Sequence, residues 1–276
     1  MTIACALGAR EAGATYSIAA VDVTARQMGG AGTSCLGGQD VAAIYKSAPG
    51  VGVVLGQARY NSSTHQRALE LLAGGTAPMD VIADVTSPEV DALASVRQYA
   101  IVDATGRTAA FTGRDTMEWS GHVEGAASER IFSVQGNILT GEDVVQNAAA
   151  SFQQASCDLA EQLLRALEAG ARDGQGDQRC TPAIPSDSAF LTVESLDTRE
   201  RILDLRVPDS GTDNPLIALR AQLDEYRATH PCATSRVAHE SESGGCALSR
   251  RRVDSGWLLA VAALVATLRR PWRSTT

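Results

Sequence analysis

The chain has 276 residues, of which 44% are hydrophobic and 20% are charged, values typical of a folded globular protein. Its net charge of −8 argues against a nucleic-acid-binding protein, because phosphate contacts need a basic surface. Only 4% of the residues are aromatic, so the core must be built mainly from Val, Leu, Ile and Ala.

The first 14 residues are interpreted as a leader or propeptide. Ala12-Gly13-Ala14 is a small-x-small triplet of the kind after which signal peptidase cuts. The segment has no basic start, and two charged residues break its short apolar run. Either the true start lies further upstream or the segment is a short propeptide. Each alternative makes Thr15 the first residue of the mature chain.

The stretch Thr15–Asp22 alternates between two sets of side chains and predicts a β-strand. One face carries Tyr16, Ile18 and Ala20, and the other carries Ser17, Ala19 and Val21. A Thr15 with a free amine would combine a hydroxyl nucleophile and a base in one residue. An unperturbed α-amine has a pKa of about 7.7–8.0, so part of it is neutral at physiological pH. The alternative is an ordinary first strand after a cleaved leader.

The rest of the pattern predicts a mixed α+β domain, because runs of strands alternate with runs of helices rather than in a βαβ order. Further strands are expected at 26–34, 51–57, 97–103, 107–112, 131–135, 190–194 and 202–207. Helices are expected at 63–73, 76–85, 141–153 and 158–170 and from 214 onward. The run Gly29-Gly30-Ala31-Gly32 is interpreted as a site of close strand packing.

Four of the six cysteines fall in the predicted domain, 15–232: Cys35, Cys157, Cys180 and Cys232. An even number of cysteines in an exported protein predicts two disulfides, and three pairings are allowed. A zinc site is the alternative, although no close pair of the zinc-ribbon type is present. The four histidines have no metal-ligand spacing, so we expect neither a metal nor a cofactor.

The composition changes after Cys232. Residues 233–245 are polar and predict a linker, and residues 246–276 form a tail. The tail contains the apolar run Gly256–Leu268 between clusters of arginine. Thirteen residues are short for a bilayer span, which needs ~20. A buried helix is the alternative, but the basic flanks favour a tail addressed to a membrane.

Several short runs are similar to those of one bacterial family: Thr15–Ala19, Val53–Ala58, Tyr99–Asp103, Gly106-Arg107, Phe111–Gly113, Ser133–Leu139, Leu163–Gly170, Gly176-Asp177 and Leu203–Val207. From Thr15 to about Tyr226 the chain therefore resembles the family catalogued as domain of unknown function 1028, which looks like part of the N-terminal-nucleophile hydrolase superfamily. The resemblance implies a four-layer αββα sandwich of two antiparallel sheets, and amide-type hydrolysis through Thr15. In family members without a leader, the matching Thr follows the initiator Met.

The tail resembles a surface-sorting signal of the MYXO-CTERM type, through Gly244-Gly245-Cys246, the arginine cluster and the apolar run. It departs from the usual layout because three arginines separate the cysteine from the apolar run. Export to the cell surface or the outer membrane follows as an expectation.

The candidate catalytic residues are Thr15 and Asn137. Asn137 or the backbone N–H groups near it would form an oxyanion hole, and ordinary Gly-Asn turn chemistry is the alternative. The candidate substrate-binding residues are Ser34, Gln57, Gln135, Asp177 and Arg179. The alternatives are core hydrogen bonding for the two glutamines and a solvated loop for Asp177 and Arg179.

We therefore expect an exported N-terminal-nucleophile hydrolase that acts on a small-molecule or peptide substrate and contacts the membrane through its tail. A non-catalytic binding module on the same fold is the first alternative. A structural subunit of a homo-oligomeric surface complex is the second.

Overall fold

Strand β1 (Thr15–Asp22) forms where the alternating pattern predicts it, at the start of the region that the computed structural model describes, residues 15–232. The residues on its two faces belong to different apolar clusters. Tyr16, Ile18 and Ala20 pack among helix residues, whereas Ala19 and Val21 pack with residues of the second sheet. The predicted leader, linker and tail lie outside the described residues.

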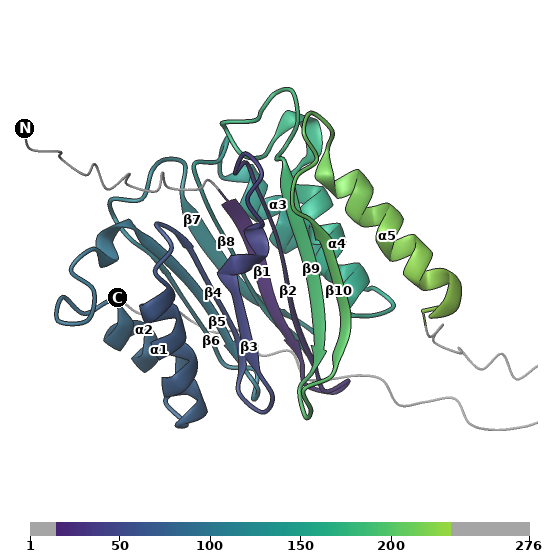
Figure 1. Cartoon of the computed structure of the whole chain (residues 1–276). Helices are drawn as coiled ribbons and strands as arrows, with labels where there is room; N and C mark the ends of the chain where they lie inside the picture. The colour runs from purple at the N-terminus through teal and green to yellow at the C-terminus, as the bar shows by residue number, and fades with distance from the viewer. Residues whose placement is uncertain (1–14, 233–276) are drawn as a thin grey trace, which may run out of the picture. The chain divides into compact units, whose positions relative to one another are not determined.

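Strand β1 lies in the middle of a six-stranded sheet with the order β10-β9-β2-β1-β8-β7, and every neighbouring pair is antiparallel (Figure 1). Its other strands are β2 (Gln27–Ser34), β7 (Gly121–Ala127), β8 (Arg130–Asn137), β9 (Ser188–Ser195) and β10 (Arg201–Val207). All eight residues of β1 are buried, as expected for a strand at the centre of a sheet that is covered on both faces.

A second, four-stranded sheet is antiparallel in the order β3-β4-β5-β6. Its strands are β3 (Tyr45–Ala48), β4 (Gly52–Ala58), β5 (Arg97–Asp103) and β6 (Thr108–Thr112). Short 3₁₀ turns at Val41–Ile44, Ala94–Val96 and Arg172–Gly174 connect the larger elements. The mixed α+β fold with two antiparallel sheets that the sequence predicts is confirmed.

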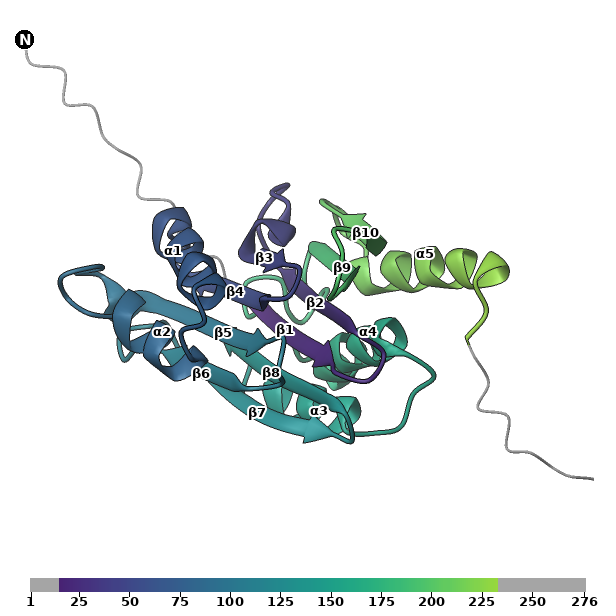
Figure 2. The ribbon, with the colours of Figure 1, turned by 90° about the horizontal axis from the view of Figure 1, so that it is seen from below.

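In the described part of the chain, five α-helices cover the sheets: α1 (Ser62–Ala73), α2 (Pro78–Val85), α3 (Asp143–Phe152), α4 (Leu159–Gly170) and α5 (Pro215–Thr229). Helices α1 and α2 pack on the four-stranded sheet, and α3, α4 and α5 pack on the six-stranded sheet (Figure 2). Within residues 15–232, no helix is long and apolar enough to cross a membrane.

The glycine run of β2 allows three strands and a side chain to approach closely. A Cβ at Gly29 would lie 2.6 Å from the carbonyl oxygen of Thr192 on β9. A Cβ at Gly30 would lie 2.7 Å from the ring of Tyr45. Distances below 3.0 Å are not compatible with a side chain, so the predicted close packing at this run is confirmed.

Candidate active site

Thr15 lies between Ser34 and Asn137 in one row across the six-stranded sheet. The register pairs Thr15 with Ser34 at the end of β2 and with Asn137 at the end of β8. The Thr15 Oγ1 and Ser34 Oγ atoms are 3.0 Å apart and share a hydrogen bond. All three side chains are buried. The sheet therefore brings together three candidate residues that are up to 122 positions apart in the sequence.

Gln57 reaches this row from the other sheet. Its Nε2 donates to the main-chain carbonyl of Thr15 at 3.0 Å and to Asn137 Oδ1 at 3.4 Å. Its Oε1 accepts from the Ser17 hydroxyl at 2.5 Å. Gln57 lies near the end of β4, where the strand passes behind β1. These contacts fix the Thr15 backbone against the second sheet.

Gln98 on β5 completes the network and was not among the residues predicted from sequence. Its Oε1 accepts from Gln57 Nε2 at 3.0 Å. Its Nε2 donates to the Gly136 carbonyl at 2.8 Å and to Thr112 Oγ1 at 3.0 Å. Gln98 is fully buried. The only signal in the sequence is an amide directly before the apolar run of a strand.

Gln135 lies on β8 opposite Ser17 and is fully buried. Neither atom of its side-chain amide has a hydrogen-bond partner within residues 15–232. The core hydrogen bonding considered as the alternative for Gln135 is therefore not supplied by that part of the chain. Its predicted role in substrate binding stays a prediction.

Asp177 is buried next to the row rather than solvated. Its carboxylate accepts from the Cys35 backbone N–H at 2.7 Å and from the Arg179 guanidinium at 2.9 Å. Burial raises the pKa of Asp177, and the hydrogen bonds from Arg179 and Cys35 oppose that rise. Because Cys35 directly follows Ser34, this carboxylate attaches the 177–180 loop to the end of β2.

The four cysteines of the predicted domain form two pairs at disulfide distance. Cys35 and Cys180 have an S–S distance of 1.98 Å, and Cys157 and Cys232 have one of 2.04 Å. The first pair lies beside Asp177, whose carboxylate accepts from the backbone N–H of Cys35, the residue directly after the end of β2. The pairing selects one of the three arrangements that the sequence allowed.

A cavity of about 270 Å³ lies next to Asn137. Asn137 lines it together with Arg59, Val96 and residues 115–117. Asn137 is also the register partner of Thr15, so the cavity adjoins the Thr15 row. A substrate bound there would have its reacting group close to that row.

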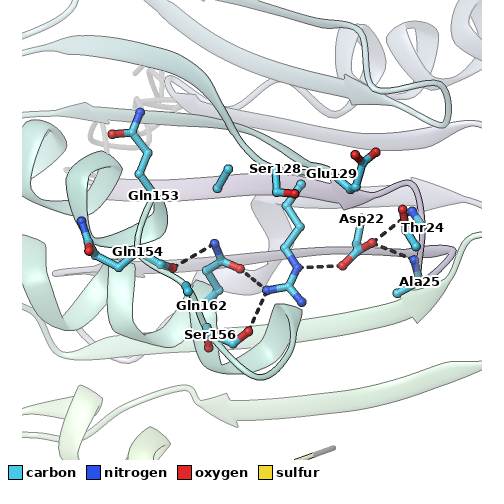
Figure 3. Close-up of a pocket in the computed structure, with 12 residues that line it drawn as sticks. Asp22, Thr24, Ala25, Ser128, Glu129, Gln153, Gln154, Ser156 and Gln162 are labelled. Atoms are coloured by element: carbon cyan, nitrogen blue, oxygen red, sulfur yellow. Dashed lines mark hydrogen bonds and ion pairs between the residues drawn. The ribbon is translucent and has the colours of Figure 1, made fainter. Parts of the chain in front are cut away.

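A larger cavity, about 510 Å³, lies at the opposite end of β1 (Figure 3). There Asp22 accepts from the N–H groups of Thr24 and Ala25, and Arg130 donates to Asp22 at 2.7 Å. Asp22 and Thr15 are seven residues apart on one strand, roughly 23 Å at about 3.3 Å per residue. Because Asp22 and Arg130 neutralise each other, we assign this ion pair a structural role.

Comparison with known proteins agrees with the fold. The model of a family of unknown function, DUF1028, matches residues 15–219 and thus begins at Thr15. The crystal structure of protein SPO2555 from Silicibacter pomeroyi, of the same family model, has a TM-score of 0.65 and 26% identity over 78% of this chain and 89% of that chain. Anbu from Hyphomicrobium sp. strain MC1 has a TM-score of 0.37 and 13% identity over 80% of this chain and 100% of that chain, too low to support an argument. No curated protein matches the chain.

Proposed function

The chain belongs to the DUF1028 family, and we propose that it is a hydrolase whose Thr15 attacks an amide-type carbonyl after the preceding residues are removed. The position of Thr15 carries this proposal. It is the first residue of both the family match and β1, and its hydroxyl lies 3.0 Å from that of Ser34. In the processed chain, one residue would hold both the nucleophilic hydroxyl and the α-amine that acts as its base.

In the proposed reaction, the Thr15 amine takes the hydroxyl proton while Oγ1 forms an ester bond to the acyl carbon. The amide C–N bond breaks, and the proton passes to the leaving amine. Water then hydrolyses the ester, which releases the acid and restores Thr15. Asn137 is the proposed oxyanion donor, because it is the neighbour of Thr15 in the row and lines the adjoining cavity.

We also propose that the two sheets and their helices form the four-layer αββα sandwich of N-terminal-nucleophile hydrolases. Three apolar clusters support this arrangement. One contains residues of the six-stranded sheet and α3–α5, a second contains residues of both sheets, and the third contains residues of the four-stranded sheet with α1 and α2.

Export is a further part of the proposal, and the two cysteine pairs support it because disulfides persist in oxidising compartments. Mass spectrometry of the exported protein without reductant is expected to find the Cys35–Cys180 and Cys157–Cys232 peptides linked. Four free thiols in the exported protein would contradict both the pairing and this argument for export.

The proposed reaction is tested by sequencing the N-terminus of the mature protein and by labelling that protein with acyl-amide probes. We expect Thr15 at the N-terminus and an acyl adduct on the peptide that begins with it. A mature protein that retains residues before Thr15 would have a blocked amine, which would support the non-catalytic alternative.

A further inference from the structure

We propose that Arg59 makes the cavity next to Asn137 a binding site for the carboxylate of an acidic acyl substrate. The inference rests on the proposed function for the reaction, whereas the carboxylate site itself rests on Arg59 and the cavity. Arg59 and Asn137 line the same space of about 270 Å³. A bound acid would therefore lie between a cation and the row that contains Thr15.

Within the described residues, 15–232, Arg59 differs from the other buried or half-buried arginines because it has no counterion there. Within residues 15–232 its guanidinium makes neither an ion pair nor a hydrogen bond, although the side chain is half-buried. Arg97, Arg130 and Arg220 all bind carboxylates of the protein. A partly desolvated guanidinium is stabilised by an anionic partner, and its planar fork fits a carboxylate in a bidentate way. The substrate would supply that partner.

The backbone at Arg59 is held rigidly, which suits a residue that positions a ligand. Arg59 N donates to the Val96 carbonyl at 3.2 Å, and the Arg97 guanidinium donates to the Arg59 carbonyl. Arg97 is in turn fixed by Asp91 at 2.8 Å, and these two side chains are only 9% and 6% exposed. Ala58 has a φ of 69°, in the left-handed region that L-residues rarely adopt.

The same strand also connects Arg59 to the candidate nucleophile. Gln57, two residues earlier, donates to the Thr15 carbonyl and contacts Asn137. The end of β4 therefore holds the backbone of Thr15 and leads directly to Arg59, whose own backbone is held by Val96 and Arg97. The distance between the acyl carbon and the carboxylate of a substrate would be set by this strand end.

Asp115 is the acidic residue that lines the cavity, and it does not neutralise Arg59. It is more than half exposed and pairs with the exposed Arg114 at 3.6 Å. The cavity is also slightly smaller than the ~300–1,000 Å³ of sites for drug-sized ligands. Both features favour a short acid, of the size of an amino acid or a C5 dicarboxylate.

The experiment uses the processed chain, Thr15–Thr276, with two p-nitroanilide probes. The first carries a glutaryl group, and the second has the free carboxylate replaced by a primary amide of the same shape. We expect Arg59→Met to lower kcat/KM for the glutaryl probe by about 10- to 100-fold, the range for a hydrogen-bonded charge pair. The amide probe should change by no more than about twofold. Arg59→Lys should retain part of the preference for the glutaryl probe over the amide probe. Arg114→Met, at an 87% exposed site, should leave this preference unchanged.

Glutarate binding, measured by calorimetry on the same proteins, separates the two proposals. Binding that is lost in Arg59→Met, with neither probe hydrolysed, would sustain the carboxylate site and contradict the proposed reaction. Hydrolysis of both probes with equal kcat/KM would support the proposed reaction and contradict the carboxylate site. Glutarate affinity that is the same in the parent protein and Arg59→Met, or no binding at millimolar glutarate, would overturn the carboxylate site.

Discussion

The side-chain amide of Gln57 donates a 3.0 Å hydrogen bond to the main-chain carbonyl of Thr15, although the two residues belong to different sheets. The same side chain contacts Ser17, Gln98 and Asn137. Hydrogen bonds between buried groups are strong, and breaking one leaves a buried polar group unpaired, which destabilises the fold. One amide thus joins the strand of the candidate nucleophile to β4, the strand that ends directly before Arg59.

The Gln57 network predicts a large effect of a near-isosteric substitution. Gln57→Leu leaves the Ser17 hydroxyl and the Gln98 carbonyl without a buried partner, at about 1–3 kcal/mol for each unsatisfied group. We expect the free energy of unfolding in urea to fall by about 2–4 kcal/mol. Gln66→Leu, on the exposed face of α1, should change it by less than about 0.5 kcal/mol. Equal effects of the two substitutions would contradict the structural role of the network.

The glycine run predicts intolerance to a single methyl group. A Cβ at Gly29 would meet the Thr192 backbone oxygen at 2.6 Å, and backbone in the middle of a sheet has little freedom to move. We expect Gly29→Ala to destabilise the domain by about 1–3 kcal/mol, with a lower Tm in thermal unfolding. Gly141→Ala is the matched control, because a Cβ there meets no atom within 4 Å. A Gly29→Ala protein as stable as the Gly141→Ala protein would show that the strands can separate without penalty.

His65 predicts a loss of stability in mild acid. Burial lowers the pKa of His65 to about 4, and its Nε2–H donates to the Val54 carbonyl at 2.8 Å. Because the unfolded chain binds the proton first, the contribution is complete above pH ~6.5 and is lost as pH falls toward 4.

The expected loss between pH 7 and pH 5 is about 1–2 kcal/mol, measured as the free energy of unfolding in urea. His65→Gln should be less stable at pH 7 but should show a smaller change between the two pH values. Asp91 and Asp103 have lowered pKa values, so their contributions are lost only at more acidic pH. An equal pH dependence in the parent and His65→Gln proteins would rule out His65 as the cause.

Sequence patterns were sufficient to predict strands and helices where a residue type has one main physical role. The alternation of β1 predicted its two faces, and the helices expected at 158–170 and from 214 onward form with Asp158 and Asn214 as their N-caps. The solvated loop considered as the alternative for Asp177 is wrong, because Asp177 is fully buried and accepts a hydrogen bond from Cys35, directly after β2.

Two strands were not predicted because they have no apolar periodicity. Strand β7 is a sheet edge whose exposed positions include His122 and Glu124, and its other face is partly glycine. Strand β3 is only four residues long and half-buried throughout. Gln98 and Arg59 were missed for a different reason. Their roles depend on partners or on a cavity that exist only after the two sheets have packed together.

The last prediction concerns Thr15, where the proposed mechanism needs a hydroxyl and a free amine on one residue. Thr15→Ala should abolish hydrolysis of acyl-amide probes, while the loss of the hydrogen bond to Ser34 should lower stability by only about 0.5–1.5 kcal/mol. Thr15→Ser keeps both groups, so it should retain part of kcat. The lost methyl group frees the χ1 rotamer and should reduce the rate.

An extra glycine before Thr15 should be as damaging as Thr15→Ala, because it moves the free amine away from the nucleophile. The control is the same protein with a protease site placed so that cleavage exposes Thr15. Activity should return on cleavage, whereas a Thr15→Ala protein treated in the same way should stay inactive. This double requirement separates the proposed mechanism from one in which a different residue activates the hydroxyl. An extended protein that hydrolyses the probe as fast as the cleaved one would show that the Thr15 amine is not the base.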